Sequence, residues 1–189
     1  MSFLRNLASK LYWLFWGATY KCWPDALWLK ITYRAKMKRK LNLKNPQSFS
    51  EKLAWLKIHD KKKIYTQMVD KYDAKNFVRD RIGDEVIIPT YGVWNDFDEI
   101  DFSKLPNKFV LKCTHDSGGI VICRDKDAFD LKRAKVKLDR SLRHNFWWWY
   151  REWPYKNVTP RILAEQYMED ETSKKGLGLT DYKFYFFNV

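Results

Sequence analysis

The hydrophobic pattern of the chain changes at Gly83, and this change restricts the fold more than any other feature. Before it the patterns favour helices: a Ser48-Phe49-Ser50-Glu51 capping box begins one helix, and a second over about 70–82 ends at the glycine. After it, apolar runs typical of strands lie at 86–89, 91–94, 109–113, 120–123, 161–167 and 181–187. With a further helix over about 130–145, the order predicts an α+β fold, an antiparallel sheet flanked by helices.

Asn45-Pro46 marks the boundary that we expect between two parts, because the residue before proline is disfavoured in the helical conformation. The predicted parts are a basic, aromatic-rich helical segment over 1–45 and a domain over 46–189. The chain has 189 residues, enough to bury a real core. Its three cysteines are too few for a disulfide scaffold, which favours a reducing, cytoplasmic compartment.

The first forty residues leave two hypotheses open. Their apolar run at 11–20 is half the length of the roughly 20 residues that a membrane-spanning helix needs. Tryptophans and a basic run at 30–40 then favour either a helical hairpin packed on the protein or a helix lying on an anionic membrane. The second hypothesis predicts a peripheral position at the inner membrane face through residues 1–40.

The charge of the chain predicts an anionic partner. Lysine and arginine number 36 against 23 acidic residues, giving a net charge of +13, and aromatic residues make up 17%. So many aromatics exclude an intrinsically disordered or collagen-like chain. A basic nucleic-acid binder is an alternative. However, the basic residues gather at 30–44 and 61–63 instead of alternating with the strand aromatics, so no nucleic acid is expected.

The segment FVLKCTHDSGGIVICRD (109–125) carries the strongest local signal for a binding site. A strand delivers Lys112, whose charge suits a nucleotide phosphate, and Ser117-Gly118-Gly119 can lay backbone amides against phosphate oxygens. An ordinary hairpin with a flexible tip is the structural alternative. Cys113, His115 and Cys123 lack the paired spacing of a zinc site, so both cysteines are expected to face the core.

A cluster of aromatic side chains at 146–153 leaves its role open as well. Packing as a brace beneath the sheet is the favoured interpretation, because tryptophan is highly buried on average. Stacking on a sugar or a base is the alternative, with Arg151 and Glu152 as candidates for substrate contacts. His59 and His144 have no catalytic context and are expected at the surface or at helix ends.

Several long blocks resemble the TupA-like ATP-grasp family, in the order of that family and over about 41–188. They are SFSEKLAWLKIHD, VDKYDAKNFV, IGDEVIIPTYGVW, FDEIDFSKLPNKFVLKCTHDSGG, REWPYKN, PRILAEQYM and DYKFYFFN. The resemblance implies the nucleotide-binding half of an ATP-grasp enzyme. It also implies a role in bacterial cell-surface polysaccharide or teichuronopeptide synthesis, with ATP as the bound nucleotide.

The resemblance also implies site residues. Lys112 matches the lysine that holds the nucleotide phosphates, and Lys71 lies near an earlier basic position of the family. The family's flexible phosphate loop corresponds to His115, Asp116, Ser117, Gly118 and Gly119. The segment that borders adenine and ribose corresponds to Glu165, Gln166, Tyr167 and Met168. Lys183, beside Asp181 in the DYKF block, is expected to approach the terminal phosphate.

The expected reaction is ATP-dependent activation of a carboxylate as an acyl phosphate, followed by attack of a nucleophile from an acidic sugar or amino-acid acceptor. A glycosyltransferase of polysaccharide synthesis is the alternative enzyme. The family's Mg²⁺ ligands lie downstream of the DYKF block, and the expected FNG reads FNV at 187–189. We therefore expect a chain truncated before its metal ligands, and hence one that is catalytically inactive by itself.

Overall fold

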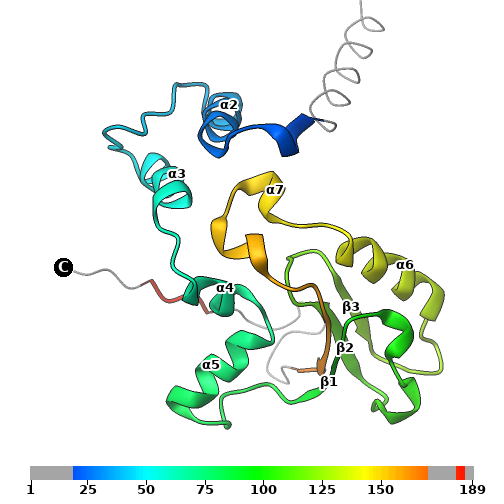
Figure 1. Cartoon of the computed structure of the whole chain (residues 1–189). Helices are drawn as coiled ribbons and strands as arrows, with labels where there is room; N and C mark the ends of the chain where they lie inside the picture. Colours follow the sequence, from blue (N-terminus) through cyan, green and yellow to red (C-terminus); the bar gives the residue numbers. More distant parts are fainter. Residues whose placement is uncertain (1–18, 170–181, 186–189) are drawn as a thin grey trace, which may run out of the picture.

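The computed structural model describes residues 19–169 and 182–185. Helices precede the first strand of the sheet, and the fold is α+β, as the sequence predicted (Figure 1). The α-helices of the described residues are α2 (Asp25–Met37), α3 (Phe49–His59), α4 (Ile64–Val69), α5 (Asp73–Ile82), α6 (Leu131–Leu142) and α7 (Trp147–Tyr150). Short 3₁₀ turns are η1 (Tyr20–Cys22), η2 (Phe97–Glu99), η3 (Phe102–Lys104) and η4 (Trp153–Asn157).

Within the described residues, four antiparallel strands form a sheet in the spatial order β1 (Thr90–Trp94), β4 (Ile162–Gln166), β2 (Phe109–Cys113) and β3 (Ile120–Cys123). Among the strands of the described residues, β4 comes last in the sequence but lies between β1 and β2. The hairpin of β2 and β3 places Lys112 opposite Ile120, as expected for the segment around the glycines. Segments far apart in the chain are thereby brought together at the centre of the sheet.

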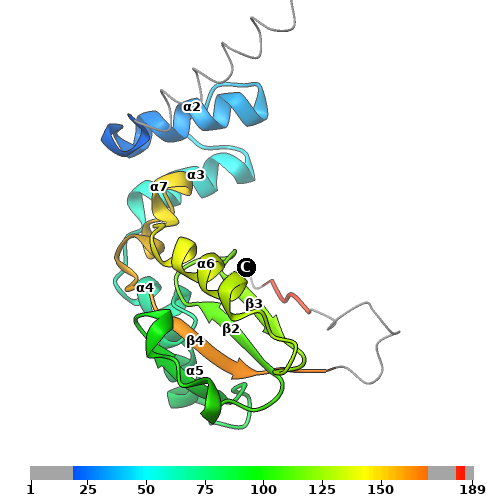
Figure 2. The same cartoon turned by 90° about the vertical axis from the view of Figure 1, so that its right-hand side faces the viewer.

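One face of the sheet packs against α6 and forms the main core. Side chains alternate along a strand, so Phe109, Leu111 and Cys113 of β2 all point to this face, where each is fully buried. Ala134 and Leu138 of α6 cover them. Figure 1 shows the sheet between α6 on one side and α4 and α5 on the other, and Figure 2 shows α6 lying along the strands.

The predicted capping box is present at the start of α3. The Ser48 hydroxyl accepts from the Glu51 amide, and the Glu51 carboxylate accepts from the Ser48 amide at 2.9 Å. The amides of Ser48 and Gln47 hold the pKa of Glu51 at about 2. The helix nevertheless leaves its apolar side chains Leu53 and Leu56 about two-fifths exposed, because only a small cluster with α2 forms beneath it.

Three expectations about elements need correction. Residues 86–89 form a turn and a short extended link, and the strand begins only at Thr90. The helix predicted over 70–82 begins at Asp73, because Asp70 turns its carboxylate back to the amides of Tyr72 and Asp73. Of the strand predicted over 181–187, residues 182–185 have no regular structure, and the other positions lie outside the described residues.

The aromatic cluster at 146–153 packs against the helices at the start of the chain, and the prediction of a brace beneath the sheet is wrong. We call η1, α2, α3, α7 and η4 together the aromatic helical region, which lies above the sheet in Figure 1. Its centre is Arg151, whose buried guanidinium pairs with Asp25 at 3.2 Å and lies over the ring of Trp147. Arg151 is therefore a packing residue and not a candidate for substrate contact.

Within the described residues, no helix is long and apolar enough to cross a membrane.

Candidate functional site

A buried carboxylate holds two lysines on the face of the sheet opposite α6. Glu165 on β4 contacts the Lys112 Nζ through Oε2 at 2.5 Å and the Lys75 Nζ through Oε1 at 2.7 Å. Glu165 is 4% exposed, whereas the Lys112 side chain is 27% exposed. We call these three residues the lysine–glutamate cluster.

The alternation of the strands explains why Lys112 and Glu165 meet. Lys112 lies between the core residues Leu111 and Cys113 and therefore points to the opposite face. Val110 is paired with Glu165, and Lys112 is paired with Leu163, so the lysine reaches the carboxylate diagonally across the strands. Lys112 and Glu165, which are far apart in the sequence, therefore lie side by side on one face of the sheet.

Lys75 enters the cluster from helix α5. Its Nζ also donates to the Ile88 carbonyl at 2.5 Å and to the Thr90 hydroxyl at 3.0 Å, which fixes the ammonium at the start of β1. The sequence interpretation overlooked this residue, although it lies in the VDKYDAKNFV block, four residues after Lys71. The spacing from Lys71 was the only signal for Lys75 in the sequence. This signal is weak, because two lysines four residues apart are common on exposed helices.

The cluster carries a net positive charge that favours an anion. Burial by itself would raise the pKa of Glu165, but the hydrogen bonds and charges of Lys112 and Lys75 outweigh burial and hold that pKa below its ordinary value. One carboxylate charge therefore faces two ammonium charges. The partly exposed Lys112 supplies the positive charge that a bound phosphate can reach.

Lys71 lies under the loop between β2 and β3 and does not contact Glu165. Its Nζ donates to the Cys113 carbonyl at 2.8 Å and to the Asp116 carbonyl. Burial lowers the pKa of Lys71, against the nearby charge of Asp116. Lys71 therefore supports the backbone of the loop from below, and its contact with phosphate stays a prediction.

The loop itself is held in shape by Asp116. Its carboxylate accepts from the Gly119 amide and from the Ser141 hydroxyl of α6. A side chain at Gly119 would lie 2.4 Å from the Ser141 oxygen and 2.8 Å from Cys113 Sγ, so only glycine fits there. Gly118, by contrast, faces open space, and no hydrogen bond to another described residue occupies its amide or that of Ser117.

His115, at the start of this loop, is buried in the interior. It is 2% exposed, and its Nε2 lies 2.9 Å from the His144 carbonyl and 3.1 Å from the Ser141 carbonyl. No hydrogen bond within the described residues reaches its Nδ1. The histidine thus fastens the loop to the end of α6, while Ser117 and Gly118 form the exposed tip.

The residues after Glu165 continue along the edge of the same face. The Gln166 amide donates to the Pro89 carbonyl at 3.0 Å, the Tyr167 hydroxyl accepts from Arg124 Nε at 3.1 Å, and Met168 is 40% exposed. Lys183 is exposed, and within the described residues it makes no hydrogen bond or ion pair. The structure therefore brings Glu165 to Lys112 but does not join Lys183 to them.

The predictions for Cys113, Cys123, His59 and His144 agree with the fold. Cys113 and Cys123 are buried on the core face, and burial raises the pKa of the Cys113 thiol to about 11. His59 and His144 are exposed at or beyond the ends of α3 and α6. Over residues 19–169 and 182–185, no three histidine, cysteine or acidic side chains come together in a way that could hold a metal ion.

The described residues thus form an antiparallel sheet flanked by helices, and one face of this sheet presents Lys112 and the buried Glu165 beside a glycine loop. A family model described as TupA-like ATPgrasp matches residues 51–189 of the chain. The chain therefore belongs to the TupA-like ATP-grasp family. No curated protein and no solved structure shows a significant match to it.

Proposed function

We propose that the chain binds ATP on the face of the sheet that carries the lysine–glutamate cluster. The observation that carries this proposal is the pairing of Lys112 with the buried Glu165, which fixes a lysine charge on a rigid strand beside a glycine loop. The phosphates lie against Lys112 and the amides of Ser117 and Gly118. Membership of the ATP-grasp family supports the choice of ATP among phosphate-containing ligands.

Adenine then lies toward β3 and the residues after Glu165. Lys112 pairs with Ile120, and Val110 pairs with Ile122, whose side chain is 44% exposed on this face. Such an apolar surface beside the backbone of Gln166 and Met168 suits a flat base.

We further propose that the activity served by this fold is an ATP-dependent ligation in bacterial cell-surface polysaccharide synthesis. An acceptor carboxylate, from an acidic sugar or an amino acid, attacks the γ-phosphorus of ATP, and the bond to the bridging oxygen breaks to release ADP. A nucleophile then attacks the acyl carbon and expels phosphate. Lys112 holds the phosphates in position for this step. The described residues provide no cluster of side chains that could hold Mg²⁺.

Binding of ATP and of adenosine to Lys112→Ala tests the assignment. A charge-assisted hydrogen bond contributes about 1.5–3 kcal/mol, so ATP binding is expected to weaken about 10- to 100-fold while adenosine binding is unchanged. Lys104→Ala is the matched control, since this lysine is exposed and forms a surface ion pair with Asp101 at 3.1 Å. Equal affinity of the wild type and Lys112→Ala for ATP would overturn the proposed site.

A further inference from the structure

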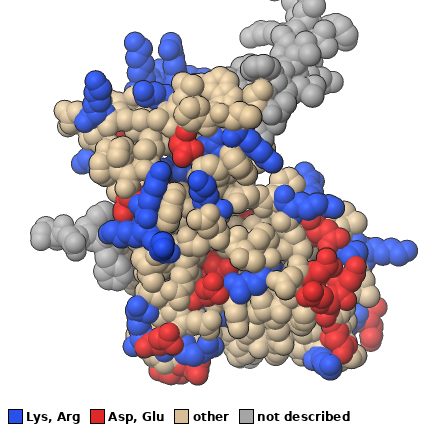
Figure 3. Space-filling model, in the orientation of Figure 1, with Lys and Arg blue, Asp and Glu red and all other residues tan. Residues whose placement is uncertain are grey.

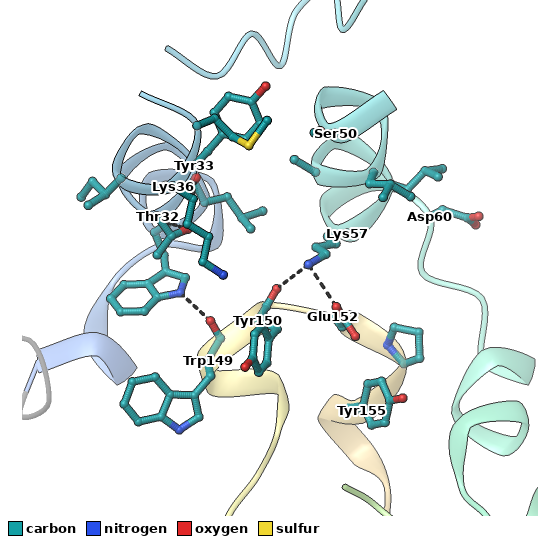
Figure 4. Close-up of a pocket in the computed structure, with 18 of the residues that line it drawn as sticks. Thr32, Tyr33, Lys36, Ser50, Lys57, Asp60, Trp149, Tyr150, Glu152 and Tyr155 are labelled. Atoms are coloured by element: carbon teal, nitrogen blue, oxygen red, sulfur yellow. Dashed lines mark hydrogen bonds and ion pairs between the residues drawn. The ribbon is translucent and has the colours of Figure 1, made fainter. Parts of the chain in front are cut away.

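A groove of about 1120 Å³ separates α2, α3 and the segment from α7 to η4, on the aromatic helical region and away from the lysine–glutamate cluster. Leu29 of α2, Leu53 and Leu56 of α3, and Trp149 and Tyr150 of α7 contribute to its largely apolar wall. Figure 4 shows the side chains of the two helices facing the α7 segment across this space. A cavity larger than the usual 300–1000 Å³ of a ligand site suits a long apolar ligand.

The apolar wall remains open in the folded chain. Phe49 is 71% exposed, and Leu53, Leu56, Trp149 and Tyr150 are each about two-fifths exposed. Soluble monomers seldom expose a contiguous apolar surface of this kind unless it binds something. Trp149 and Tyr150 have an apolar body with a polar edge, the combination that is enriched where a protein meets the surface of a bilayer.

The walls of the groove are fastened in place. The Lys57 Nζ of α3 bonds the Tyr150 carbonyl and the Glu152 carboxylate, each at 3.1 Å, and the Trp28 indole of α2 donates to the Trp149 carbonyl at 3.0 Å. Arg151, between these residues, adopts a left-handed backbone with φ of 51°, a conformation rare for a residue with a side chain. The groove is therefore a built feature and not a loose gap.

Basic residues dominate the α2 side of the groove, whereas the lining as a whole also contains Asp60 and Glu152, the second of which is paired with Lys57. Residues 25–40 contain six basic residues and one acidic residue, Asp25, which Arg151 already neutralises. Lys36 lines the groove, with its ammonium 5.6 Å from the centre of the Tyr150 ring, and has no carboxylate partner within the described residues. In Figure 3 blue side chains project over α2 at the top, whereas most of the red atoms lie over the lower half of the molecule.

We propose that this groove docks the protein on a membrane containing anionic phospholipid. An acyl chain enters the apolar groove, and the lipid phosphates contact Lys36 and the exposed basic residues of α2. A basic cluster beside an apolar helical surface is the combination that binds anionic leaflets, and a neutral lipid would match only the apolar part of it. The proposal does not rest on the nucleotide site, which lies on the sheet.

Vesicle flotation of the full chain tests the proposal. Vesicles of phosphatidylcholine with about 30% phosphatidylglycerol are expected to carry the wild type, and pure phosphatidylcholine vesicles or high salt to carry much less. Lys36→Glu should lower binding at least about fivefold, because one basic residue near an anionic surface contributes about that factor. Lys132→Glu, an exposed lysine on α6, is the charge control and should bind like the wild type.

The apolar part of the site has its own pair of variants. Leu53→Ser with Leu56→Ser should lose binding, whereas Val136→Ser, a 69% exposed position on α6, should keep it. Quenching of tryptophan fluorescence by lipid brominated in the acyl chain should fall in Trp149→Phe. It should stay unchanged in Trp55→Phe, which removes a tryptophan of α3 that does not line the groove. If circular dichroism shows that the double variant does not fold, Lys36→Glu and Trp149→Phe provide the test of the proposal.

Three outcomes would overturn the proposal. The wild type does not float with anionic vesicles, or it floats and the groove variants float equally well. In the third, the wild type forms a dimer that Leu53→Ser with Leu56→Ser dissociates, without binding vesicles, which would assign the groove to a second copy of the chain.

Discussion

The sheet with α6 and the aromatic helical region are similarly rich in large apolar residues but bury them to different extents. Phe109, Leu111 and Leu138 in the sheet core are completely inaccessible, whereas Leu53 and Leu56 on α3 are about two-fifths exposed. In the first region two layers cover each other. In the second, short helices meet around one arginine and leave a groove between them. The difference teaches that apolar content alone does not show whether a surface is core or binding site.

Alanine at two leucines should give the largest contrast between the regions. Leu111→Ala leaves a cavity in a close-packed core and should lower the free energy of unfolding by about 2–5 kcal/mol. Leu53→Ala removes a side chain that is already 43% exposed and should cost less than about 1 kcal/mol. Urea unfolding followed by tryptophan fluorescence measures both. Equal losses would mean that the groove is as tightly packed as the sheet.

Removing Arg151 should damage the aromatic helical region selectively. The guanidinium bonds the Trp148 and Trp23 carbonyls and pairs with Asp25, so Arg151→Ala should cost about 3 kcal/mol. Limited proteolysis should then cleave the region of α2 and α3 before the sheet. Arg133→Ala, at an exposed position of α6, should behave like the wild type. Uniform cleavage of the whole chain would contradict separate stability of the two regions.

The lysine–glutamate cluster should make the sheet region sensitive to acid. Glu165→Gln leaves Lys75 and Lys112 close together without their carboxylate and should cost about 2 kcal/mol at neutral pH. The folded pKa of Glu165 is depressed, so its contribution is present above the unfolded value of about 4.3 and is lost as pH falls through the folded pKa. As the pH is lowered below about 4.3, the free energy of unfolding of the wild type should therefore decrease more steeply than that of Glu165→Gln.

Glu169→Gln is the control for this comparison, because Glu169 forms an exposed pair with Lys108. Denaturant midpoints between pH 3 and pH 7 distinguish the variants. Parallel pH profiles of Glu165→Gln and the wild type would show that the cluster does not stabilise the sheet.

The smallest expected effect concerns the cap of α3. Ser48→Ala removes the hydroxyl oxygen that accepts a hydrogen bond from the Glu51 amide. The variant should lose about 1 kcal/mol of stability, and the loss should be confined to the aromatic helical region. Ser48→Asp keeps a capping oxygen and should be close to the wild type. Hydrogen exchange of the first amides of α3 measures the loss locally. An equal increase in exchange across the sheet would contradict a local role for the cap.

The sequence was sufficient for features that depend on neighbours in the chain. The capping box, α6, the β2–β3 hairpin and the inward-facing Cys113 and Cys123 were all predictable from spacing. The local pattern gave wrong element boundaries where contacts beyond the pattern decided the structure. Asp70 displaced the start of α5, and the apolar run at 86–89 stayed outside the sheet. The site residues Lys112 and Glu165 could be named from family blocks, but their direct contact could not.

The sequence by itself determined the α+β class, the excess of positive charge and the family, because composition, periodicity and motif blocks are properties of the chain alone. The tertiary structure decided which residues share a site. Lys75 and Lys112 meet at Glu165 because β4, which follows the other described strands in the sequence, lies between β1 and β2. It also turned the aromatic run at 146–153 toward α2, where a buried arginine and a groove replaced the expected brace, since long-range packing follows from shape and not from residue type.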